Sequence, residues 1–71
     1  MNKFDVKLVG RNIRTLRESR GLKQIELAKE VKIGGNNLAR WERGEVIPKI
    51  DSFFRLADYF DVKMDTIINY Q

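Results

Sequence analysis

Apolar residues near the start of the chain recur at the spacing of one helix face. Val9, Ile13 and Leu16 stand four and three residues apart, so their side chains share one side of a helix with 3.6 residues per turn. Gly21 follows a basic last turn, where helices commonly end on a left-handed residue. The pattern predicts a first helix from Val6 to Arg20.

A second, shorter stripe follows this glycine. Leu22 and Leu27 have the spacing at which a residue before a helix packs against one in its first turn, and this predicts a helix beginning at Gln24. Its inward residues are Leu27, Ala28 and Val31, which gives it a length of about two turns.

A third stripe begins after a pair of glycines. Leu38, Trp41 and Glu42 share one helix face, and Gly44 ends the pattern. We therefore expect a third helix from about Gly35 to Arg43, followed by a loop over residues 45–48.

The last third of the chain predicts two more helices and no strand. Asp51 stands in the favourable first turn of the fourth helix, and the fifth is short. No segment alternates with period two for long enough to indicate a strand, so the expected fold class is all-α. The apolar positions are Ile50, Phe53, Leu56, Ala57 and Phe60 in the fourth helix, and Met64, Ile67 and Ile68 in the fifth.

The second and third helices are joined by a connection of about three residues. Two short helices joined in this way cross steeply and form a helix-turn-helix unit, here over about residues 24–43, whose second helix enters the DNA major groove. Ala28 has a side chain small enough for close approach at the crossing, and Ile33, Leu38 and Trp41 would fill the angle from the core side. Residues 1–71 are expected to form one domain of five helices.

Composition excludes most other classes of function. The 71 residues include no cysteine and no histidine, which removes disulfides, thiolate zinc sites and the commonest general base. Only Ser19 and Ser52 are serines, and no glycine-rich phosphate loop is present. We expect no enzyme, cofactor, metal or small-molecule ligand.

The net charge of +4 is unevenly distributed along the chain. Residues 1–44 carry eleven basic and five acidic side chains, whereas residues 45–71 carry three basic and five acidic ones. Such asymmetry suits binding of a polyanion on one side, with the acidic helices facing away. No run of about 18 apolar residues or signal peptide core occurs, so the sequence predicts a cytoplasmic protein, and Met1 suggests a natural start.

Several spaced motifs together resemble the phage-repressor and Cro-like (XRE) helix-turn-helix family. The resemblance covers residues 13–67 and implies a five-helix domain that binds operator DNA, usually as a symmetric dimer on a palindrome, to control transcription as a regulator or repressor. The matching residues are Gln24, Glu26, Leu27 and Ala28; Leu38, Trp41, Glu42 and Gly44; and Pro48, Leu56, Ala57 and Val62.

The chain departs from the family pattern at helix ends. Lys32 and Asp61 stand where the family often has glycine, and lysine tolerates a left-handed backbone poorly, so the turn is expected to be strained or reshaped. Lys23, Gly34 and Lys63 replace the usual serine or threonine caps, which predicts modest stability.

The resemblance and the helix periodicity together assign side-chain roles. With Leu38 and Trp41 inward, the base-reading candidates on the opposite face are Asn36, Asn37 and Arg40, beside Gly35, which permits close approach. The phosphate candidates are Gln24, Arg43, Lys23 and Lys49. The family also implies an ion pair between Arg17 and Glu42 that ties the first helix to the third.

Three pairs of adjacent apolar residues, here called the apolar doublets, leave the choice of partner open: Phe53–Phe54, Tyr59–Phe60 and Ile67–Ile68. Phe54, Tyr59 or Ile68 could form part of a self-association surface, or could lie at crowded core edges. The alternative function is a protein-interaction module, such as an antitoxin or an antagonist of another regulator, for which DNA binding would be absent or insensitive to salt.

Overall fold

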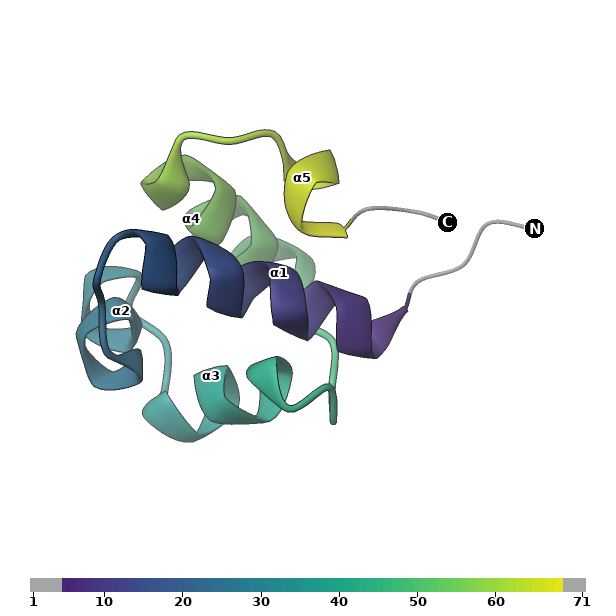
Figure 1. The fold of residues 1–71 in the computed structure, drawn as a ribbon, viewed down its shortest axis with the longest axis horizontal. Helices are drawn as coiled ribbons and strands as arrows, with labels where there is room; N and C mark the ends of the chain where they lie inside the picture. The colour runs from purple at the N-terminus through teal and green to yellow at the C-terminus, as the bar shows by residue number, and fades with distance from the viewer. Residues whose placement is uncertain (1–4, 69–71) are drawn as a thin grey trace.

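The computed structural model describes residues 5–68, which form five helices and no strand (Figure 1). The predicted all-α fold is therefore confirmed. The first and third helices each end one residue earlier than expected, because Arg20 and Arg43 cap them instead of continuing them. The helices are α1 (Val6–Ser19), α2 (Gln24–Glu30), α3 (Gly35–Glu42), α4 (Ile50–Phe60) and α5 (Met64–Ile68).

Two acidic side chains accept backbone hydrogen bonds at helix starts that lack a serine or threonine cap. The side chain of Asp5 accepts hydrogen bonds from the backbone N–H groups of Lys7 and Leu8 at 3.0 and 3.1 Å and so caps α1. At α2, Glu26 reaches back to accept the backbone N–H of Lys23 at 2.7 Å. Of the capping losses predicted from the sequence, the one at α2 is therefore partly offset by Glu26.

Helices α1 to α4 all end in the same type of turn. At α1, Gly21 has φ 67° and the N–H of Leu22 donates to the carbonyl of Arg17 at 3.1 Å, the bond pattern of a Schellman motif. We call each of these C-terminal turns a helix stop. In the stops of α2, α3 and α4 the residues with a left-handed backbone are Lys32, Gly44 and Asp61, with φ values of 57°, 75° and 55°. In three of the four stops the next residue is apolar and packs against the core: Leu22, Ile33 and Val62.

Lys32 adopts the left-handed conformation that its side chain disfavours, as the sequence predicted. The turn keeps its full set of bonds, because the N–H of Ile33 donates to the carbonyl of Ala28 at 2.9 Å. Arg55 of α4 also donates to the carbonyls of Val31 and Lys32, at 3.4 and 3.0 Å. The cross-link to α4 holds the strained turn in place.

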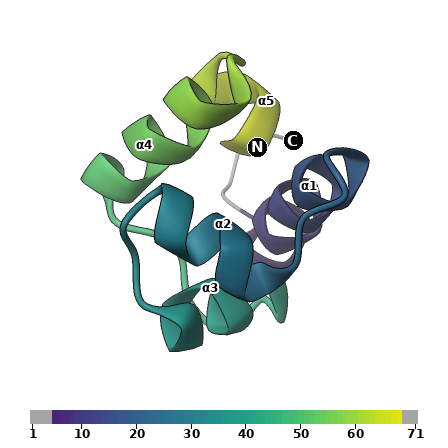
Figure 2. The same cartoon turned by 90° about the vertical axis from the view of Figure 1, so that its left-hand side faces the viewer.

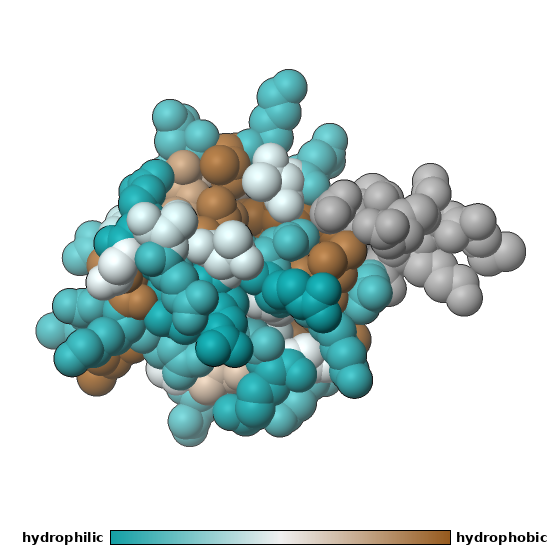
Figure 3. All heavy atoms as spheres, viewed as in Figure 1, coloured by the Kyte–Doolittle hydropathy of each residue, from teal (hydrophilic) through white to brown (hydrophobic). Residues whose placement is uncertain are grey.

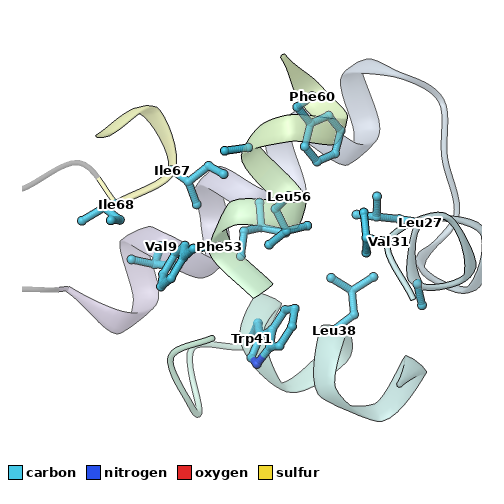
Figure 4. Close-up of a cluster of buried hydrophobic side chains, with 13 residues drawn as sticks. Val9, Leu27, Val31, Leu38, Trp41, Phe53, Leu56, Phe60, Ile67 and Ile68 are labelled. Carbon is cyan, nitrogen blue, oxygen red and sulfur yellow. The ribbon is translucent and has the colours of Figure 1, made fainter. Parts of the chain in front are cut away.

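One core of thirteen buried apolar residues joins all five helices (Figure 4). Leu38 and Trp41 from α3 point toward Phe53 and Leu56 of α4, which lie near the centre of the cluster. Ala28 is buried as predicted at the α2 crossing, and Ile33 is half-buried against the core.

The sequence placed Ile50 in the apolar stripe of the fourth helix, and this was wrong. Ile50 is 63% exposed, because it is the first residue of α4 and lies beyond the part of the helix that packs on the core. The four later members of that stripe, Phe53, Leu56, Ala57 and Phe60, are all buried.

Gly10 sets the distance between α1 and α3. A Cβ atom at this position would lie 2.1 Å from the backbone carbonyl oxygen of Trp41 and 3.0 Å from that of Glu42. No other residue therefore fits between the two helices as they stand. The role of Gly10 was missed in the sequence, where it lies in the middle of a predicted helix.

Figures 1 and 2 place α3 and α5 on opposite sides of the molecule. Helix α3 lies along the lower edge in both views; α1 lies above it in Figure 1, and α2 lies above it in Figure 2. One long side of α3 therefore has no protein neighbour among the described residues.

Candidate nucleic-acid interface

The outward face of α3 is polar and open to solvent. Asn36, Asn37 and Arg40 are exposed, whereas Leu38 and Trp41 on the other side are buried. Gly35, the first residue of α3, has no atom within 4 Å of the position a Cβ would occupy. The helix thus presents amide and guanidinium groups on a rigid support, and its first turn carries no bulk that would keep a ligand away.

A buried ionic network fixes α3 to α1 from behind. The Nε and Nη2 atoms of Arg17 donate to the two carboxylate oxygens of Glu42 at 2.7 and 3.0 Å, and Nη1 donates to the carbonyl of Leu22 at 2.6 Å. The side chains of Arg17 and Glu42 are only 11% and 4% exposed. The hydrogen bond to Glu42 raises the pKa of Arg17.

Gln24 extends this network to the start of α2. Its amide nitrogen donates to Glu42 at 3.0 Å, so the donor that we assigned to a DNA phosphate is partly used inside the protein. An amide NH₂ group has two hydrogens, and the second remains available to a ligand. Glu42 therefore aligns three helices, because it contacts residues of α1 and α2 from its place at the end of α3.

The two arginines at the end of α3 share one carboxylate. Arg43 donates to Glu45 from Nε at 2.6 Å and from Nη2 at 3.4 Å, and the Nε of Arg40 lies 3.6 Å from the same carboxylate. The hydrogen bond raises the pKa of Arg43 and lowers that of Glu45. The role of Glu45 was missed in the sequence, although its place just after Gly44 put it within reach of both arginines.

The two predicted lysine contacts lie at separate places around α3. Lys23 is exposed just before α2, and Lys49 is exposed just before α4. Lys49 lines a hollow together with Asn37 and Trp41 of α3, so it borders the same surface as the base-reading candidates. The structure does not bring Lys23 into contact with these residues.

Two other arginines, Arg20 and Arg55, make contacts within the fold. Arg20 donates to the carbonyl of Phe60 at 3.1 Å, and its guanidinium lies 5.9 and 5.4 Å from the ring centres of Tyr59 and Phe60. Arg55 holds the Lys32 turn and also pairs with Asp51 at 3.3 Å. The count of basic residues therefore overstates the charge that is free to meet an anion.

The apolar doublets have three different fates. Phe54 is 60% exposed, and with Ile50 one turn earlier it forms an outward apolar pair on α4. Tyr59 is half-buried and meets Phe60 edge to face. Ile68 is only 7% exposed and packs into the core from α5, so of the two alternatives for this residue the structure supports a place in the core.

Hydrophilic side chains cover most of the face drawn in Figure 3, and the hydrophobic atoms gather in separate patches. Within residues 5–68, no group of acidic side chains is placed to hold a metal ion. In the same range no helix has the length and apolar character that crossing a bilayer requires.

Comparison with known proteins assigns this arrangement to a family. The helix-turn-helix family matches residues 13–67. The HTH-type transcriptional regulator ImmR of Bacillus subtilis (strain 168) is 30% identical over 60 residues, which are 84% of this chain and 47% of ImmR. The chain thus spans about half the length of that relative.

Two solved structures have the same fold at slightly lower identity. The restriction-modification controller protein C.AhdI from Aeromonas hydrophila superposes with a TM-score of 0.82 at 25% identity, covering 89% of this chain and 96% of that one. The P22 c2 repressor, solved in complex with a synthetic operator, gives a TM-score of 0.81 at 26% identity, covering 86% and 92%. The chain belongs to the helix-turn-helix family, among its phage-repressor and Cro-like (XRE-type) members.

Proposed function

We propose that the chain is a sequence-specific, double-stranded DNA-binding transcription regulator that inserts α3 into the major groove. The observation that carries the proposal is the two-sided character of α3. Its inner face is locked by Leu38, Trp41 and the buried Arg17–Glu42 pair, while its outer face presents exposed polar side chains. The names of ImmR and of the P22 c2 repressor, which was solved with operator DNA, support the same function.

The side chains on the outer face have the chemistry of base recognition. Asn36 can form a bidentate pair with adenine in which it donates one hydrogen bond and accepts another. Arg40 can donate two hydrogen bonds to guanine, at N7 and O6. Gly35 allows the helix start to approach the groove, and Asn37 reaches either a base or a phosphate.

A second set of groups is proposed to bind phosphates. Gln24 combines its remaining amide hydrogen with the backbone N–H groups at the start of α2. Arg43, Lys23 and Lys49 supply positive charge around α3. These contacts fix the orientation of the domain on the duplex and carry no sequence information.

We further propose that the chain acts as a homodimer on a palindromic operator, as a repressor in the bacterial cytoplasm, with no catalytic role. Two-fold symmetric operators require two copies of a recognition helix, held one or more turns of DNA apart. The outward pair of Ile50 and Phe54 on α4 is the apolar surface that supports self-association.

Two variants with the same change in charge test the division between base and phosphate contacts. Arg40→Ala should relax specificity at one base pair, because it removes a base-reading side chain. Arg43→Ala should weaken binding to all sequences alike and lower the salt slope by about 1, because it removes one phosphate contact.

Competition binding against single-base variants of a selected operator measures both effects. Identical profiles for the two variants would contradict the assigned roles. Absent or salt-insensitive DNA binding would favour the alternative, a helix-turn-helix protein-interaction module such as an antitoxin or an antagonist of another regulator.

A further inference from the structure

Glu45 occupies an unusual place among the helix stops of this fold. In the stops of α1, α2 and α4 the residue after the left-handed one is Leu22, Ile33 or Val62, and each packs against the core. At the stop of α3 that residue is Glu45, whose side chain is 46% exposed. A charged residue here gives up the apolar contact that usually accompanies the motif.

The backbone of the helix stop after α3 brings Glu45 back toward that helix. Gly44 has φ 75°, its N–H donates to the carbonyl of Trp41 at 3.0 Å, and the N–H of Glu45 donates to the carbonyl of Arg40 at 3.0 Å. The chain therefore folds back along the last turn of α3. This main-chain geometry places Glu45 beside the last turn of α3, where its side chain reaches Arg40 and Arg43.

The carboxylate contacts the two arginines in different ways. It occupies two donors of Arg43, Nε and Nη2, at 2.6 and 3.4 Å. It approaches Arg40 only at Nε, at 3.6 Å, a charge contact that is too long for a strong hydrogen bond. Among the described residues neither Nη atom of Arg40 forms a hydrogen bond, so the end of that guanidinium is left open for a guanine.

We propose that Glu45 is a specificity-determining positioning residue: it aims Arg40 at its base, competes with phosphate for Arg43 and adds a negative charge beside the DNA. This inference rests on the proposed function of α3. A carboxylate on this face repels phosphates, and it weakens the contact that Arg43 makes with them because it shares the charge of that arginine. The domain thereby gives up general affinity and gains discrimination between sequences.

The variant Glu45→Gln should raise the affinity for non-specific DNA and lower the discrimination between operator sequences. Affinity for DNA that lacks the operator should rise about two- to fivefold, the size of an exposed charge interaction. Its salt slope should steepen by up to about 1, because Arg43 no longer shares its charge between Glu45 and a phosphate. Discrimination at the base pair read by Arg40 should fall about threefold or more, a part of what a bidentate arginine contact provides.

Glu30→Gln is the matched control, because it makes the same chemical change elsewhere. Glu30 ends α2 and lines a surface hollow with Asp58 and Tyr59 of α4, away from the polar face of α3. We expect this control to alter the discrimination ratio by less than the scatter of the assay. Glu45→Ala, which removes the contact completely, should change affinity and discrimination in the same directions as Glu45→Gln.

A second readout tests the contact without any DNA. In the ¹H–¹⁵N spectrum of the free protein, the Nε–H signals of Arg40 and Arg43 should shift in Glu45→Gln and stay in place in Glu30→Gln. Unmoved signals, or equal losses of affinity and discrimination, would overturn the role of Glu45. If the signals shift but the unaltered chain binds no DNA, the proposed function fails and the inference about specificity fails with it.

Discussion

Glu42 is the single side chain on which the orientation of α3 most depends. Glu42→Ala leaves the guanidinium of Arg17 without its partner in a site where that side chain is only 11% exposed, and it also releases Gln24. We expect a loss of about 3 to 5 kcal/mol in the free energy of unfolding. Thermal or urea unfolding measures it.

Arg14→Ala is the control for this loss, because Arg14 pairs with Glu18 at the surface, where both side chains are more than half exposed. Removal of such a pair costs roughly 1 kcal/mol or less. An unchanged melting temperature in Glu42→Ala would show that the buried pair does not hold α3 in place.

Lys32 carries backbone strain that glycine would relieve. Its φ of 57° places a β-carbon in the left-handed region, so Lys32→Gly should raise the free energy of unfolding by about 0.5 to 1 kcal/mol. In a domain of this size the melting temperature should rise by roughly 2 to 8 °C.

Lys29→Gly should have the opposite effect on the melting temperature. Lys29 is exposed in the right-handed last turn of α2, where glycine lowers stability by about 0.5 to 1 kcal/mol. If both variants lowered the melting temperature, the strain at Lys32 would be refuted.

At the level of helices, alanine substitution of two glycines should have opposite effects on stability. Gly10→Ala forces a β-carbon against the backbone oxygen of Trp41 and should lower the free energy of unfolding by about 1 to 3 kcal/mol. Gly35→Ala meets no atom within 4 Å, and it should raise helix stability by up to about 1 kcal/mol while weakening DNA binding.

Unfolding and DNA binding must both be measured on these two variants. The account of the α1–α3 contact fails if Gly10→Ala is as stable as the unaltered chain. The account of Gly35 as a point of close approach fails if Gly35→Ala binds DNA equally well.

The sequence predicts most elements because apolar spacing and helix stops are local properties. The stripe of Val9, Ile13 and Leu16 and the stop at Gly21 were enough to place α1 to within one residue. Ile50 broke the rule, because periodicity says which side a residue lies on but not how far along the helix the core extends.

The candidate site is less predictable, because its contacts join residues distant in sequence. The Arg17–Glu42 contact was anticipated only through the family resemblance, and the structure places those residues together. The bond from Gln24 to Glu42 depends on how the side chains meet after folding, and no spacing rule in the sequence indicates it. The contacts of Glu45 with Arg40 and Arg43 are the exception, because they are local in sequence and follow from the turn at Gly44.

In the whole molecule, acidic side chains gather toward the end of the chain. Helix α3 and the α4–α5 end lie apart in both ribbon views, and residues 58–68 carry Asp58, Asp61 and Asp65 against Lys63. An anionic duplex is repelled from that end, which favours encounters in which α3 faces the DNA.

Selection of bound duplexes from a random DNA pool tests directly whether α3 reads DNA sequence. We expect enrichment of a two-fold symmetric sequence, with half-site centres separated by about 10 base pairs or a multiple of that spacing. We also expect that Arg40→Ala loses the preference at one position in each half-site. A pool that remains random after repeated selection with the unaltered chain would contradict the claim that α3 reads DNA.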